Sequence, residues 1–169
     1  PPRRLTDLDG VASQPVFSPD GRWIAYYRIL LNKRDIWVVS ASGGSPTAFT
    51  HDSMSNVCPA WSPAGDRIAY ASERTGTSQI WVAPVSDGKP SGPARQLTRA
   101  EYSALAPSWS PDGSMIAFAG FVKDEGDVGL VPSGGDGAAR KITHGAKVKR
   151  LRWDRRTGEI LALGSWGEK

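Results

Sequence analysis

The chain has 169 residues, of which 39% are hydrophobic and 22% are charged, the ordinary composition of a globular domain that can bury a core. A net charge of +4 gives no general case for nucleic-acid binding, and no apolar run is long enough to cross a membrane. The only cysteine, Cys58, excludes an internal disulfide and a cysteine-based metal site. Because the chain starts Pro1-Pro2-Arg3-Arg4 without a methionine, we expect its start to be processed or cut from something longer.

A short pattern recurs along the chain: an aromatic residue, a tight turn of the Ser-Pro-Asp-Gly type, and a second apolar run. Proline, aspartate and glycine favour such turns, because proline presets φ, aspartate bonds its own backbone and glycine accepts positive φ. The aromatic positions are 44 to 48 residues apart, at Phe17, Trp61, Trp109 and Trp153. A second marker ends in threonine, at Thr6, Thr50, Thr98 and Thr143. Two markers in fixed order indicate an internal repeat.

Each repeat contains four apolar runs of strand length, and no segment shows a helical stripe. In the second unit we expect strands at 57–62, 67–72, 79–84 and 94–98. Runs such as Trp23 to Tyr27 are apolar on both faces, which indicates a sheet that is covered on both sides. Four short antiparallel strands in units of about 45 residues predict an all-β fold, a β-propeller of four-stranded antiparallel blades.

The order of the markers gives about three and a half blades. Residues 1–6 are expected to form an outer strand, followed by blades at 11–50, 55–98 and 103–143 and an incomplete blade at 147–169. An array of this length does not close a ring, so it leaves apolar blade faces in water. We therefore expect the chain to be a segment of a larger propeller, or its open faces to be covered by another copy.

The motifs resemble the WD40-like repeat of TolB-type β-propellers: Trp109-Ser-Pro-Asp-Gly113, Ile116-Ala-Phe118, Ile80-Trp-Val82 and Gln96-Leu-Thr98. The sequence departs from that pattern at Ala64, at 128–130 and at 154–158. The family includes the periplasmic protein TolB, propeller domains of prolyl-oligopeptidase-type serine peptidases, oligogalacturonate lyases and sensor domains. The resemblance implies a periplasmic or secreted location, and a cytoplasmic one stays open.

The loops at one end of the blades vary from unit to unit, as a binding surface would. In TolB-like proteins this surface and the channel mouth bind a peptide or a protein, so the resemblance implies such a partner. The alternative is that these loops are polar only because they are solvated. The candidate residues are Arg34, His51, Asp52, Glu73, Arg74, Tyr102, Lys123 and His144.

The sequence predicts neither a metal site nor a cofactor. His51 and His144 occupy equivalent positions, but they belong to blades two apart and no third ligand is evident. Basic residues gather between Arg140 and Arg156; we interpret them as a solvated or channel-lining strand rather than a phosphate-binding patch.

No catalytic motif is present: the chain has no Gly-x-Ser-x-Gly elbow, no P-loop and no His-Glu-x-x-His. Cys58 precedes a proline on an inner strand and is expected to be buried. The sequence therefore predicts a non-catalytic binding scaffold. The alternative is an accessory propeller of a prolyl-oligopeptidase-type serine peptidase or of a carbohydrate lyase, with the chemistry outside this segment.

Overall fold

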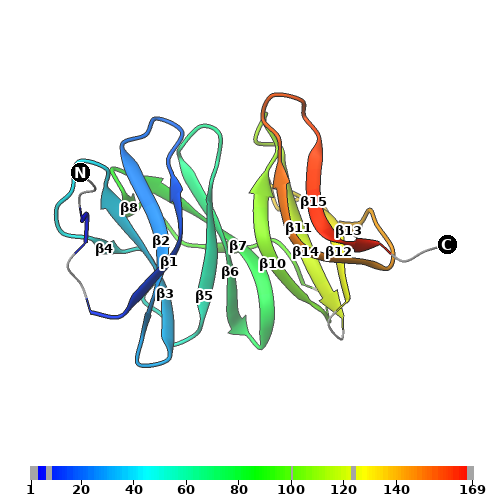
Figure 1. Cartoon of the computed structure of the whole chain (residues 1–169), viewed down its shortest axis with the longest axis horizontal. Helices are drawn as coiled ribbons and strands as arrows, with labels where there is room; N and C mark the ends of the chain where they lie inside the picture. Colours follow the sequence, from blue (N-terminus) through cyan, green and yellow to red (C-terminus); the bar gives the residue numbers. More distant parts are fainter. Residues whose placement is uncertain (1–3, 7–8, 100, 123–124, 167–169) are drawn as a thin grey trace.

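The computed structural model describes residues 4–6, 9–99, 101–122 and 125–166, and the described residues form an all-β structure (Figure 1). Blade 1 contains β1 (Val11–Phe17), β2 (Trp23–Leu30), β3 (Lys33–Ser40) and β4 (Thr47–Ala48). Blade 2 contains β5 (Asn56–Trp61), β6 (Arg67–Thr75), β7 (Thr77–Ser86), β8 (Lys89–Pro90) and β9 (Arg95–Gln96). Blade 3 contains β10 (Ser103–Trp109), β11 (Met115–Val122), β12 (Glu125–Pro132) and β13 (Arg140–Lys141). The half-blade contains β14 (Ala146–Trp153) and β15 (Ile160–Trp166).

Neighbouring strands within each blade pair antiparallel, and the sheets stack on one another in chain order. Figure 1 shows the turns between first and second strands along the top and the hairpins between second and third strands along the bottom. The structure therefore confirms the predicted class, an incomplete propeller of antiparallel blades. Residues 4–6, which belong to the expected outer strand, have no strand assignment, but Leu5 packs on blade 1 beside Ile24, Tyr26 and Val39.

The turns at the top are closed by a serine and an aspartate. In blade 3 the Ser110 hydroxyl accepts a hydrogen bond from the Met115 amide at 2.9 Å and donates to Asp112 at 2.5 Å. Blade 1 repeats this arrangement with Ser18 and Asp20. Blade 2 has Ala64 at the aspartate position, and Asp66 accepts the hydroxyl of its serine instead, at 2.8 Å. This departure from the repeat therefore keeps the same hydrogen bond.

The threonine marker joins the outer and third strands. The Thr98 hydroxyl accepts from the Ile80 amide at 2.8 Å and donates to the side chain of Gln79 at 2.7 Å. Blade 1 has the same bridge between Thr50 and Asp35, and blade 3 has it between Thr143 and Asp127. Buried backbone groups need such partners, which explains why threonine recurs at this position.

Apolar residues from adjacent blades form the core between them. Trp61 is 5% exposed between blades 1 and 2, and Trp109 is 4% exposed between blades 2 and 3. Trp109 also donates from Nε1 to the carbonyl of Ala60 in the preceding blade, at 3.0 Å. Trp61 and Trp109 therefore attach blades 2 and 3 to the blade before each, whereas the indole of Trp153 donates to Gly158 in its own turn at 2.9 Å.

The third strand of blade 3 departs from the Ile-Trp-Val pattern but is complete. Gly129 replaces the tryptophan and pairs with Phe118 across the sheet. A Cβ atom at Gly129 would collide with the Phe118 ring, so that ring occupies the space of a side chain at this position. Blade 2 is four residues longer than blade 1 when counted from the Ile-Trp-Val run to the threonine, Ile80 to Thr98 against Ile36 to Thr50. The added residues accommodate the hairpin of β7 and β8, which the repeat did not predict.

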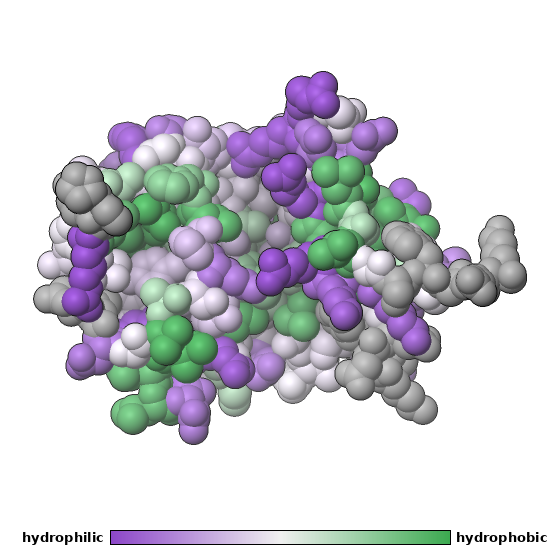
Figure 2. All heavy atoms as spheres, viewed as in Figure 1, coloured by the Kyte–Doolittle hydropathy of each residue, from purple (hydrophilic) through white to green (hydrophobic). Residues whose placement is uncertain are grey.

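Both ends of the array expose apolar side chains. Phe17 is 63% exposed, although it occupies the position of Trp61 and Trp109, because no described blade precedes it. At the other end Leu161 and Leu163 are 48% and 68% exposed on β15, and a hydrophobic patch covers this strand in Figure 2. The exposure at each end is what an unclosed array predicts.

Substitutions of Trp109 and Phe17, which occupy equivalent positions in their units, should show how much burial of the aromatic ring contributes to stability. We expect Trp109→Ala to lower the free energy of unfolding by about 3–5 kcal/mol, since it opens a cavity between two blades. Phe17→Ala should cost less than about 1 kcal/mol, because the ring is largely in water. Urea denaturation followed by circular dichroism makes the comparison. Similar losses in the two variants would mean that Phe17 is covered in solution.

The aspartates of the turns should make stability depend on pH. The hydroxyl of Ser110, and then the amide and hydroxyl of Ser114, lower the pKa of Asp112 from 3.8 to about 2. Its contribution to stability is therefore complete above about pH 4 and is lost as the pH falls towards about 2. We expect Asp112→Asn to have a lower melting temperature than the wild type at pH 7, and the difference to shrink over that acidic range. A difference that stays constant with pH would contradict this assignment.

Candidate functional site

The loop face, defined as the hairpins along the bottom of Figure 1 together with the loops that connect successive blades, contains the candidate residues named from the sequence. Arg34, His51, Glu73 and His144 are exposed, whereas Asp52, Arg74 and Tyr102 are half-buried. Lys123 lies outside the described residues.

Arg74 is held inside blade 2 rather than presented to solvent. Its guanidinium lies 2.7 Å from the carboxylate of Asp52 and donates to the Tyr70 hydroxyl at 3.0 Å. It also lies over the Trp81 ring, 4.3 Å from the centroid. Asp52 in turn accepts the side-chain amide of Asn56 at 2.8 Å. The structure thus brings Arg74 and Asp52 together as a connection between two loops.

The other candidates do not form one cluster. Tyr102 contacts Lys141, whose ammonium lies 5.1 Å from the ring centroid, and its carbonyl accepts the side-chain amide of Gln79 at 3.1 Å. The described residues contain no group of three or more side chains that could hold a metal ion, so His51 and His144 are two separate exposed histidines there.

The loop face has one prominent feature that the sequence analysis missed. The hairpin between β2 and β3 turns through Leu31 and Asn32, which both have positive φ, 49° and 65°. Such a two-residue turn normally contains asparagine and glycine, because a bulky residue is strained there. Leu31 is 93% exposed and Leu30 is 39% exposed. The sequence signal for this feature was the apolar pair Leu30-Leu31 directly before Asn32, in a loop between two apolar runs.

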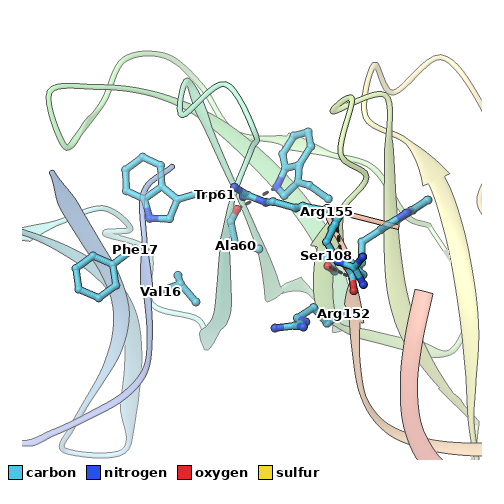
Figure 3. A pocket seen from close by; sticks show the side chains of 11 residues that line it. Val16, Phe17, Ala60, Trp61, Ser108, Arg152 and Arg155 are labelled. Atoms are coloured by element: carbon cyan, nitrogen blue, oxygen red, sulfur yellow. Dashed lines mark hydrogen bonds between the residues drawn. The ribbon is translucent and has the colours of Figure 1, made fainter. Parts of the chain in front are cut away.

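A cavity of about 500 Å³ lies at the opposite end, where the first strand of each blade meets its turn. We call it the turn-end cavity; it is shown in Figure 3. Its lining comes from all four units: Val16, Phe17, Ala60, Trp61, Ser108, Trp109, Arg152, Trp153, Asp154, Arg155 and Arg156. The structure thus places Arg152, Arg155 and Arg156, part of the predicted basic run, on a cavity at the inner strands.

Cys58 lies on inner strand β5 at an irregularity of the pairing with β6, and it has a positive φ of 57°. Burial is the main influence on this thiol and raises its pKa; contacts with the Ala106 backbone and the Gln14 side chain act in the opposite direction. The thiol is therefore protonated at neutral pH and is a poor nucleophile.

A family model described as the TolB beta propeller domain matches residues 2–119. The chain belongs to the TolB β-propeller family. No curated protein sequence matches it.

Solved structures share the fold. A putative TolB from Agrobacterium tumefaciens is 26% identical, with a TM-score of 0.76 over 96% of this chain and 60% of that one. TolB from Acinetobacter baumannii is 22% identical, with a TM-score of 0.66 over 82% of this chain and 34% of that one. A puromycin-hydrolyzing peptidase from Mycobacterium tuberculosis is 16% identical, with a TM-score of 0.68 over 95% of this chain and 30% of that one. The chain therefore spans less than two thirds of the length of each of these proteins.

The network around Arg74 predicts a structural role that can be measured. We expect Arg74→Met to lower the free energy of unfolding by about 1–3 kcal/mol, because it leaves the half-buried Asp52 and the buried hydroxyl of Tyr70 without Arg74 as a partner. Arg34→Met, at an exposed position, should change stability by less than about 0.5 kcal/mol. Urea denaturation compares the two. Equal stability of both variants would show that the Arg74 contacts contribute nothing to the fold.

Proposed function

We propose that this propeller is a non-catalytic scaffold that binds a peptide or protein partner on its loop face. The observation that carries the proposal is the hairpin tip, where Leu31 is 93% exposed in a backbone conformation that disfavours leucine. Asparagine or glycine would relieve the strain of roughly 1 kcal/mol, so the leucine has no evident benefit to the fold. Leu31 forms contiguous exposed apolar surface with Leu30, which is 39% exposed, and contiguous apolar surface marks interaction sites.

The surroundings of the tip favour a partner with both apolar and acidic groups. Lys33 and Arg34 directly follow the turn and are exposed. Lys33 is paired with Asp35 at 3.0 Å, whereas no ion pair involves Arg34 within the described part of the chain. Leu31 would enter an apolar pocket on the partner, and Arg34 would meet a carboxylate at its rim.

The alternative is an accessory propeller attached to a catalytic domain of a serine peptidase or a lyase. The similarity in fold to a puromycin-hydrolyzing peptidase supports this alternative only at the level of architecture. A periplasmic or secreted location remains part of the proposal. The described residues include no helix that could span a membrane.

A display library of random peptides, selected on the immobilised protein, tests the proposal. The informative variant is Leu31→Asn, because it removes the apolar tip and suits the turn better than leucine. We expect Leu31→Asn to keep or raise the melting temperature while the affinity of the selected peptides falls by roughly tenfold or more. Isothermal titration calorimetry gives the affinities.

Arg34→Gln should weaken the same peptides, and most strongly those with acidic residues. Arg140→Gln is the matched control, because Arg140 is exposed on outer strand β13, away from the tip. Selected peptides that bind Leu31→Asn and Arg34→Gln as tightly as the wild type would reject the loop face as the binding surface.

A further inference from the structure

We propose that the turn-end cavity is a second binding site, which takes the carboxylate of an organic acid and holds an adjoining apolar or aromatic group. The cavity lies at the opposite end of the blades from the loop face, so this site is independent of the function proposed above. Its volume of about 500 Å³ falls in the range of small-molecule sites in proteins.

The charge of the cavity comes from one strand and its turn. Arg152 is the penultimate residue of β14, and Arg155 and Arg156 follow in the turn. In Figure 3 Arg152 and Arg155 point from this side towards β5 and the open space in front of it. None of the three guanidinium groups has a hydrogen bond or an ion pair within the described part of the chain. Guanidinium groups bind carboxylates with two parallel hydrogen bonds, so this wall is suited to an organic anion.

Asp154 does not cancel this charge. Its carboxylate accepts the backbone amide of Arg156 at 2.8 Å, and its backbone carbonyl accepts the amide of Gly158 at 2.9 Å. The carboxylate therefore closes the turn locally and has no ion pair with any of the three arginines. Three cations and one anion leave the cavity with an excess of positive charge.

The remaining walls are neutral and largely apolar. Phe17, Trp61 and Trp109 contribute aromatic surface, and Val16 and Ala60 contribute aliphatic surface. Ser108 adds one polar group: its oxygen accepts the Trp153 amide at 2.8 Å, which leaves the hydroxyl hydrogen able to donate. A ligand that is entirely charged would leave the aromatic walls without a partner. An acid attached to an apolar group satisfies both parts of the lining.

The site exists because the fourth unit departs from the repeat. The first three units place Ser-Pro after the aromatic, and the serine binds an aspartate of its own turn. The fourth unit has Asp154-Arg155-Arg156 instead, so one aspartate closes the turn and two arginines become available. The replacement of Ser-Pro-Asp by Asp154-Arg155-Arg156 thus places two of the three arginines at the cavity.

A matched pair of small probes tests the proposal: N-acetylphenylalanine, which has a free carboxylate, and its amide, which has none. Titrations are followed by NMR on the arginine Nε–H signals and by tryptophan fluorescence. We expect the acid to bind the wild-type chain at least about tenfold more tightly than the amide, and the difference to shrink as ionic strength rises. Acetate should bind more weakly than the acid, because it lacks the apolar group.

Because Arg152 and Arg155 are exposed, replacing them should change binding with little effect on the stability of the fold. The double variant Arg152→Gln/Arg155→Gln should bind the acid no more tightly than the wild type binds the amide. Arg140→Gln, with the same chemical change on outer strand β13, should bind the acid as the wild type does.

Equal affinity for the acid and the amide would overturn the proposal, as would unchanged affinity in the double variant. Binding of inorganic phosphate as tight as that of the acid would also overturn it, because the apolar walls would then contribute nothing. A peptide that ends in phenylalanine with a free carboxylate distinguishes the source of the ligand. Tighter binding of the peptide than of the acid assigns the site to a chain terminus, and equal binding assigns it to a free acid.

Discussion

The structure depends on the packing of one aromatic side chain per unit against the preceding blade. Trp61 and Trp109 are almost fully buried between adjacent sheets, and each sheet is apolar on both faces. A blade alone would leave both faces in water, so its stability comes from its neighbours.

The two ends of the blades are built under different constraints. At the turn end, serine and aspartate close each hairpin with the same hydrogen bonds, even where the aspartate moves from the position of Ala64 to Asp66. At the loop end the threonine bridge recurs in all three blades, whereas the contacts of Arg74 and Asp52 belong to blade 2 alone. The sites proposed here occur at departures from these patterns: a leucine in a strained turn at the loop end, and Arg155 and Arg156 in place of the proline and the aspartate at the turn end.

Loss of a repeat motif has two different physical meanings in this chain. Gly129 replaces a tryptophan because the Phe118 ring already fills that space, so the change preserves the packing of the sheet. Asp154 replaces the serine of the turn, and Arg155 and Arg156 replace the proline and the aspartate; the two arginine side chains make no hydrogen bond within the described part of the chain. The first departure concerns the core, whereas the second places unpaired charge beside a cavity.

The sequence by itself determined the fold class, because turn residues and apolar runs act over a few neighbouring residues. It also predicted the exposed apolar ends, which follow from counting blades. It missed the β7–β8 hairpin, and residues 4–6 of the expected outer strand form no strand. It did not determine which polar loop residues would be free: Arg74, Asp52 and Tyr102 are engaged by partners distant in the chain. Only the tertiary structure decided that Leu31 lies in a positive-φ turn and that Arg152 and Arg155 share a cavity with Phe17 and Trp61. The cavity joins strands far apart in sequence, and local pattern contains no information on distances between them. The Leu31 turn is local, but leucine is not typical of a positive-φ turn, so its residue types did not predict that conformation.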